Sequence, residues 1–115
     1  MSILDRFRPP HRPGLRYSDE ARHWATTHFP ESHSQIAAVA AGILCEQTGA
    51  PLSKLCASTR FIQDIGFYDY FDTVDYSKAV QQEFQLVIPD CDLAKIHCIS
   101  DLVKYLHERI AERAT

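Results

Sequence analysis

The stretch FIQDIGFYDYFDTVDYSKAVQQEFQLVIPD, residues 61–90, decides the fold of this chain. Its second half repeats apolar residues at helical spacing, which predicts a helix over about residues 72–86. Asp72 stands where a cap or a partner of the helix dipole is expected. Asp90, after Pro89, is expected to cap a short helix with Leu93 and Ile96 facing inward. The predicted inner face of the longer helix consists of Phe71, Val74, Ser77, Val80 and Phe84.

Upstream of this stretch the sequence predicts another helix and a long connection. Ile36, Val39, Ala40 and Ile43 follow the spacing of one helix face, over about residues 34–48. Gly49 is expected to end that helix. Residues 50–70 would form a loop, and a structureless loop of that length is unusual in a compact domain. Its apolar residues are therefore expected to pin it against the core: Leu52, Leu55, Phe61, Ile62 and Ile65.

The two ends of the chain complete the predicted organisation. Residues 1–16 are rich in proline and are interpreted as a disordered arm. A short helix is expected within residues 17–30, where Ser18 is the cap and Trp24 clamps the helix onto the domain. Residues 31–115 form the main domain, whose last helix is predicted to begin at Ser100. The inner face of that last helix would hold Leu102, Val103, Leu106 and Ile110.

The predicted fold class is therefore all-α. Three main helices and one short helix form an irregular four-helix bundle, preceded by the extra N-terminal helix and the mobile arm. No segment shows the alternation of a strand, and no internal repeat is present.

Charge and cysteine content narrow the class of function. Residues 1–30 carry five arginines against three acidic residues, a net charge of +2, whereas the chain as a whole has −3. A basic arm on an acidic domain favours protein partners over nucleic acid. No apolar run is long enough to span a membrane, and the four cysteines form no CxxC pair, so free thiols in a reducing cytoplasm are expected. His97 and Cys98, with Cys91, match no common zinc spacing, so no metal is expected.

Several motifs, in their order and spacing, resemble those of acyl carrier proteins. Residues 61–66, FIQDIG, resemble the family's F-x-x-D-L-G, and residues 72–75, DTVD, resemble D-T-V-E. Residues 83–90, EFQLVIPD, resemble E-F-x-x-x-I-P-D, and residues 101–106, DLVKYL, resemble the family's ending. The resemblance covers roughly residues 34–110 and implies the four-helix carrier fold.

One departure from the family pattern bears directly on function. The resemblance implies a D-S-L triplet whose serine accepts 4′-phosphopantetheine, but this chain has Asp69, Tyr70 and Phe71 there. One extra residue also lies between Gly66 and Asp69. A phenol is longer than a serine side chain by a whole ring, so it is not expected to fit a transferase site made for serine. Phosphopantetheine is therefore not expected as a cofactor.

Three functions remain open on these grounds. The favoured hypothesis is a non-catalytic interaction module that binds a protein partner, for example an acyl-transfer or synthase enzyme, as a monomer. The alternatives are an atypical acyl carrier in fatty-acid or polyketide-type synthesis, and a non-covalent acyl or lipid binder. An enzyme is not expected, because no paired nucleophile and base and no phosphate loop are found. The interaction residues would be Tyr68, Asp69, Tyr70, Phe71, Asp72 and Asp75.

A cluster of aromatic residues at the start of the third helix allows two interpretations. Its members either fill the cleft that would hold an acyl chain or form an exposed binding face. The sequence leaves this choice open for Phe67, Tyr68, Tyr70, Phe71 and Tyr76.

Overall fold

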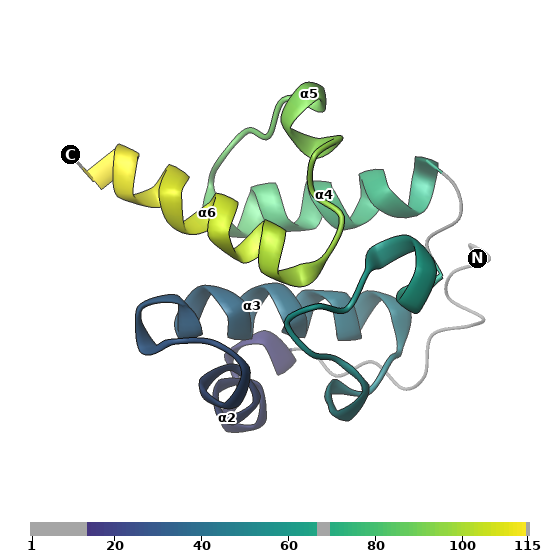
Figure 1. Cartoon of the computed structure of the whole chain (residues 1–115), viewed down its shortest axis with the longest axis vertical. Helices are drawn as coiled ribbons and strands as arrows, with labels where there is room; N and C mark the ends of the chain where they lie inside the picture. The colour runs from purple at the N-terminus through teal and green to yellow at the C-terminus, as the bar shows by residue number, and fades with distance from the viewer. Residues whose placement is uncertain (1–13, 67–69, 115) are drawn as a thin grey trace. The chain divides into compact units, whose positions relative to one another are not determined.

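The computed structural model describes residues 14–66 and 70–114, without the side chains of residues 70–74 and 114. The described residues are helical apart from loops and one isolated bridge between Arg60 and Cys98, which confirms the all-α class (Figure 1). The chain divides into two compact units, one ending at Leu55 and one beginning at Cys56. The first unit contains η1 (Leu15–Tyr17), α2 (Asp19–His28), α3 (Glu31–Thr48) and η2 (Leu52–Lys54). The second contains η3 (Phe61–Ile65), α4 (Tyr70–Phe84), α5 (Asp90–Leu93) and α6 (Ile99–Ala114).

The helix α3 is the longest element of the first unit. It ends as predicted at Gly49, which has a left-handed φ of 78°. It begins at Glu31, three residues before the predicted start, because Pro30 is its N-cap in an extended conformation. All residues from Ala37 to Cys45 are buried, so the buried surface is wider than the predicted stripe.

The helix α2 packs on α3, as the predicted clamp requires (Figure 1). The Ser18 hydroxyl accepts a hydrogen bond from the Ala21 amide at 3.1 Å, which confirms Ser18 as the cap. The indole of Trp24 is buried, and its Nε1 donates to the Leu55 carbonyl at 2.9 Å. Trp24 therefore has the structural role that the sequence predicted.

The prediction that the disordered arm extends to residue 16 is wrong for Leu15 and Arg16. Leu15 is buried, and the Arg16 side chain donates from Nε and Nη2 to the Glu46 carboxylate at 3.1 and 2.8 Å. Gly42 of α3 allows this approach, because a Cβ there would lie 2.3 Å from the Arg16 Cα. These residues belong to the folded unit, whereas residues 1–13 lie outside the described residues. The predicted limit after residue 30 stays a prediction.

The long connection between α3 and α4 is anchored at several points. Leu52, Leu55 and Phe61 are buried as expected, and Ile65 is half-buried. Ile62, however, is 60% exposed, so its predicted inward position is wrong. The π-helical turn of η3 turns Phe61 inward and leaves the next residue toward solvent.

Hydrogen bonds join the beginning of the second unit to the start of α6. The Ile99 amide donates to the Thr59 carbonyl at 3.0 Å, and the Phe61 amide donates to the His97 carbonyl at 3.0 Å. Because Ile99 is the first residue of α6, Ser100 is not its cap. Asp101 instead accepts a bond from the His97 amide at 3.1 Å.

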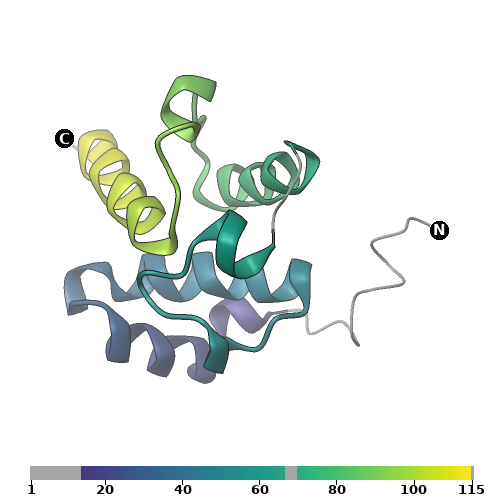
Figure 2. The same cartoon turned by 45° about the vertical axis from the view of Figure 1, so that its right-hand side comes forward.

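The bounds of α4 and α5 also differ from the predicted ones. α4 spans Tyr70–Phe84, so Asp72 lies in its first described turn, where a partner of the helix dipole is expected. Pro89, not Asp90, is the N-cap of α5. Figure 2 shows α5 in the connection between α4 and α6. The predicted inner face of α6 is confirmed for Leu102, Val103 and Leu106, which are buried, while Ile110 is half-buried. Phe84, on the predicted inner face of α4, is half-buried.

Candidate functional site

Of the residues predicted to interact with a partner, Tyr70, Phe71, Asp72 and Asp75 belong to α4. Tyr68 and Asp69 lie outside the described residues, as do the side chains of Tyr70, Phe71 and Asp72. The backbone places Tyr70 at the first residue of α4, and Asp75 is exposed in the next turn. That these six residues form one surface stays a prediction.

An apolar cleft lies within the second unit, close to the same helix. It has a volume of about 20 Å³, which is room for about one water molecule. Among the described lining side chains, Tyr76 and Ser77 carry hydroxyl groups. The lining residues are Phe61, Tyr76, Ser77, Val80, Ile88, Leu93, Ile96 and Leu102.

Two aromatic rings fill one side of this cleft. The rings of Phe61 and Tyr76 are 5.5 Å apart between centroids and tilted by 48°. Both side chains are buried, and such tilted pairs are favourable beyond the area that they bury. For Tyr76, the choice between a core residue and an exposed binding face is thereby decided in favour of the core. The other members of the aromatic cluster are outside the described side chains.

The two serines near the motif occupy different environments. Ser77 is buried, and its hydroxyl accepts a bond from Gln81 Nε2 at 2.7 Å. Ser58 is exposed in the loop, with its hydroxyl 3.3 Å from the Cys56 sulfur.

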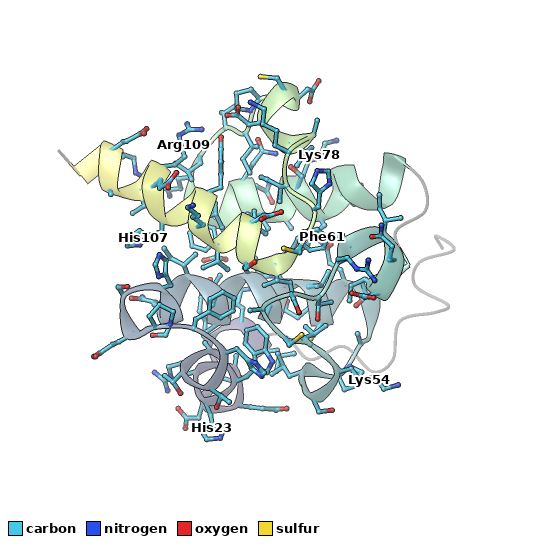
Figure 3. All side chains as sticks on the ribbon, in the orientation of Figure 1. His23, Lys54, Phe61, Lys78, His107 and Arg109 are labelled. Carbon is cyan, nitrogen blue, oxygen red and sulfur yellow. The ribbon has the colours of Figure 1, made fainter. Side chains whose placement is uncertain are left out.

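The second unit contains a polar cluster that the sequence interpretation missed. The Tyr105 hydroxyl on α6 donates to Asp92 Oδ2 on α5 at 2.7 Å. Arg109, labelled in Figure 3, donates to the same hydroxyl oxygen, and its guanidinium lies 5.5 Å from the Tyr105 ring centroid. Burial, and then the bond to Asp92, raises the pKa of the Tyr105 phenol. The bonds of this cluster connect α5 to α6. The spacing of residues 92 and 105 in the sequence did not predict this contact.

One exposed thiol has a perturbed environment. Hydrogen bonds from the Ser58 hydroxyl, and then from the Thr59 hydroxyl, lower the pKa of the Cys56 thiol. Cys45, by contrast, is buried as a small hydrophobic residue. Within the part of the chain that the structure describes, no three His, Cys, Asp or Glu side chains gather as metal ligands would.

The comparisons with known proteins agree with the motifs. The chain is 37% identical over 67 residues to the acyl carrier protein of Bdellovibrio bacteriovorus, covering 58% of this chain and 85% of that protein. It is 32% identical over 66 residues to the acyl carrier protein of Akkermansia muciniphila, covering 57% and 81% respectively. No family model matches the chain. Among the described residues, no helix has the length and apolar character needed to cross a membrane. With this identity over most of the length of its relatives, the chain belongs to the acyl carrier protein family.

Proposed function

We propose that this chain is an acyl-carrier-type domain without a phosphopantetheine arm, and that it serves as a non-catalytic protein-interaction module. The observation that carries the proposal is Tyr70 at the position of the family's acceptor serine. The described part of α4 begins at this residue.

The chemistry of attachment explains why this exchange matters. A serine hydroxyl at a helix N-terminus is short, and the phosphodiester formed on it is stabilised by the helix dipole. A tyrosine oxygen lies several ångströms further from the backbone, so the attacking atom and the bound coenzyme A would be out of register. Ser77 offers no substitute, because it is buried and bonded to Gln81. These arguments support the proposal that the chain carries no phosphopantetheine.

The cleft in the second unit supports the same conclusion. Its volume of about 20 Å³ holds about one water, and an alkyl chain of several methylenes needs many times that space. The Phe61 and Tyr76 rings line this cleft and pack against each other. Because the cleft is apolar, a non-covalent acyl or lipid binder remains the second candidate, for which the cleft would have to widen.

The proposed partner is a protein, of the acyl-transfer or synthase class that acyl carriers serve. Tyrosine side chains combine an apolar ring with a polar tip and are frequent in binding hot spots. The proposed surface combines such rings with carboxylates, which suit a basic partner surface. It comprises Tyr68, Asp69, Tyr70, Phe71, Asp72 and Asp75, of which Asp75 is exposed among the described side chains. We propose that the chain acts as a monomer in the cytoplasm, where free thiols persist.

A transferase assay tests the missing arm. Purified chain is incubated with coenzyme A, magnesium and a broad-specificity phosphopantetheinyl transferase, and its intact mass is measured. We expect no mass increase, whereas a serine-bearing acyl carrier protein in the same reaction is modified. Tyr70→Ser should gain slow modification, and more when Phe67 is also deleted to restore the loop length. Modification of the unmutated chain would show that it is an atypical carrier.

A pull-down from the native host tests the interaction surface. The captured partner should bind Tyr70→Ala at least tenfold more weakly than wild type, as expected for a central aromatic contact. Tyr17→Ala is the matched control, since Tyr17 is 59% exposed and lies in the first unit. Circular dichroism establishes that both variants are folded. Equal affinities for wild type and Tyr70→Ala would move the surface elsewhere.

A further inference from the structure

The C-terminus of α4 ends in a strained cap. The Leu86 amide donates to the Gln81 carbonyl at 3.0 Å, and the Gln85 amide lies 3.4 Å from the Gln82 carbonyl. This pair of bonds forms a Schellman motif, in which glycine usually occupies the left-handed position. Here Gln85 occupies it, with φ 55°. A non-glycine residue in that region is strained and persists where the surroundings hold it in place.

Arg113 of α6 supplies part of that support. Its Nη1 donates to the Phe84 carbonyl at 2.9 Å and to the Gln85 carbonyl at 2.8 Å. Carbonyls at a helix C-terminus lack partners within the helix and carry the negative end of its dipole, so a guanidinium is well suited to bind them. These two bonds connect residues 28 and 29 positions apart in the chain, and we name them the Arg113 bridge.

The segment that follows the strained cap forms one wall of the apolar cleft. This cleft wall, residues 85–96, contributes Ile88, Leu93 and Ile96 to the lining. Ile88 is buried, Leu93 and Ile96 are half-buried, and Val87 is 73% exposed.

Two further bonds to the cleft wall come from side chains of α4 and α6. The Ile88 amide donates to Gln81 Oε1 at 2.9 Å, and Asp92 accepts the bond from Tyr105 at 2.7 Å. A segment with little buried apolar surface and a few polar bonds opens locally more readily than the core.

We infer that the Arg113 bridge keeps the cleft wall closed, and that its release lets the wall move outward about Gln85 and widens the apolar cleft. Two observations support this step: the strained residue lies at the root of the wall, and the bridge binds the carbonyl of that residue. The closed cleft has room for about one water. The inference goes beyond the proposed function and does not depend on whether Tyr70 carries an arm.

Amide hydrogen exchange on the full chain tests the Arg113 bridge. In Arg113→Ala the amides of Leu86 and Ile88 should exchange about threefold to tenfold faster, the change expected for loss of one net hydrogen bond. The amides of Ala40 and Ile43 on α3 should be unchanged. Lys104→Ala is the matched control, because it removes one positive charge from an exposed position of the same helix. The apolar probe 8-anilinonaphthalene-1-sulfonate should become more fluorescent with Arg113→Ala and not with Lys104→Ala.

A second variant separates the proposed opening from a general loss of stability. Glycine adopts the left-handed region without strain, so Gln85→Gly in the Arg113→Ala background should slow the exchange at Leu86 and Ile88 again. Unchanged exchange in Arg113→Ala would overturn the inference. So would equal acceleration of all amides, which would indicate global unfolding, or the same acceleration in Lys104→Ala, which would indicate an effect of charge alone.

Discussion

Gly42→Ala is the substitution for which the structure predicts the sharpest effect. The added Cβ would lie 2.3 Å from the Cα and 2.8 Å from the backbone nitrogen of Arg16. A clash between two backbones cannot be relieved by rotating a side chain. Either α3 shifts or the segment Leu15–Tyr17 moves away from α3. Because the segment has 3 residues and α3 has 18, we expect the segment to detach from α3.

The magnitude follows from what the departing segment loses. Leu15 is 6% exposed, and burying a leucine contributes about 1.5–3 kcal/mol. The bonds from Arg16 to the Glu46 carboxylate, whose side chain is 7% exposed, contribute about 1.5–3 kcal/mol as charge-assisted hydrogen bonds. Alanine regains about 1 kcal/mol over glycine inside a helix. The net loss of stability should therefore be about 2–5 kcal/mol.

Urea unfolding measures this loss directly. Trp24 is the only tryptophan and is buried in the same unit, so its fluorescence reports on the affected region. The control is the same substitution in a chain that begins at Ser18, where the Arg16 backbone is absent and alanine should instead raise stability by about 1 kcal/mol. If Gly42→Ala is as stable as wild type in the full chain, Leu15–Tyr17 does not pack on α3 and the reasoning is refuted.

Three further outcomes follow from contacts described above. Trp24→Phe should lower the free energy of unfolding by about 1–3 kcal/mol, because the buried Leu55 carbonyl loses its donor; an unchanged urea midpoint would contradict this. Ser58→Ala should move the pH midpoint of Cys56 alkylation upward, because the Ser58 hydroxyl contributes most to the lowered pKa of that thiol. Peptide-resolved mass spectrometry measures the alkylation rate, and equal midpoints would count against the hydrogen bond. Deleting residues 1–13 should leave the melting temperature nearly unchanged, whereas deleting residues 1–16 should lower it, and calorimetry of both chains tests this difference.

The sequence predicted helix ends well where the signal is a local side chain. Ser18 and Gly49 occupy the capping positions expected of them, because a hydroxyl acceptor and a left-handed glycine act within one turn. Two starts were misplaced where proline is the N-cap. Pro30 and Pro89 are extended there and make no side-chain bond, so no polar cap marks either start. The prediction of Asp90 as a cap is therefore wrong, and the predicted start of α3 is three residues late.

No comparable sequence pattern predicted the contacts between residues far apart in the chain. Arg16 and Glu46 are 30 residues apart, and Arg113 and Phe84 are 29 apart, so no periodicity relates them. The cleft likewise depends on how η3, α4, α5 and α6 pack, and its volume cannot be obtained from a pattern of apolar residues. Tyr70, in contrast, was identified from motif spacing alone, because the motifs flank it closely on both sides.

The nine buried residues 37–45 of α3 limit how this chain can diverge. Five of them are alanine or glycine, so most single-codon changes there add atoms. Overpacking a tight interior lowers stability by about 1–3 kcal/mol, a large part of what a small domain has. A mutagenesis library sorted for folded protein should therefore be depleted of variants at these positions, while exposed residues such as Val87 and Ile62 accept many. New surfaces are free to evolve on the second unit, as long as this run of small side chains is retained.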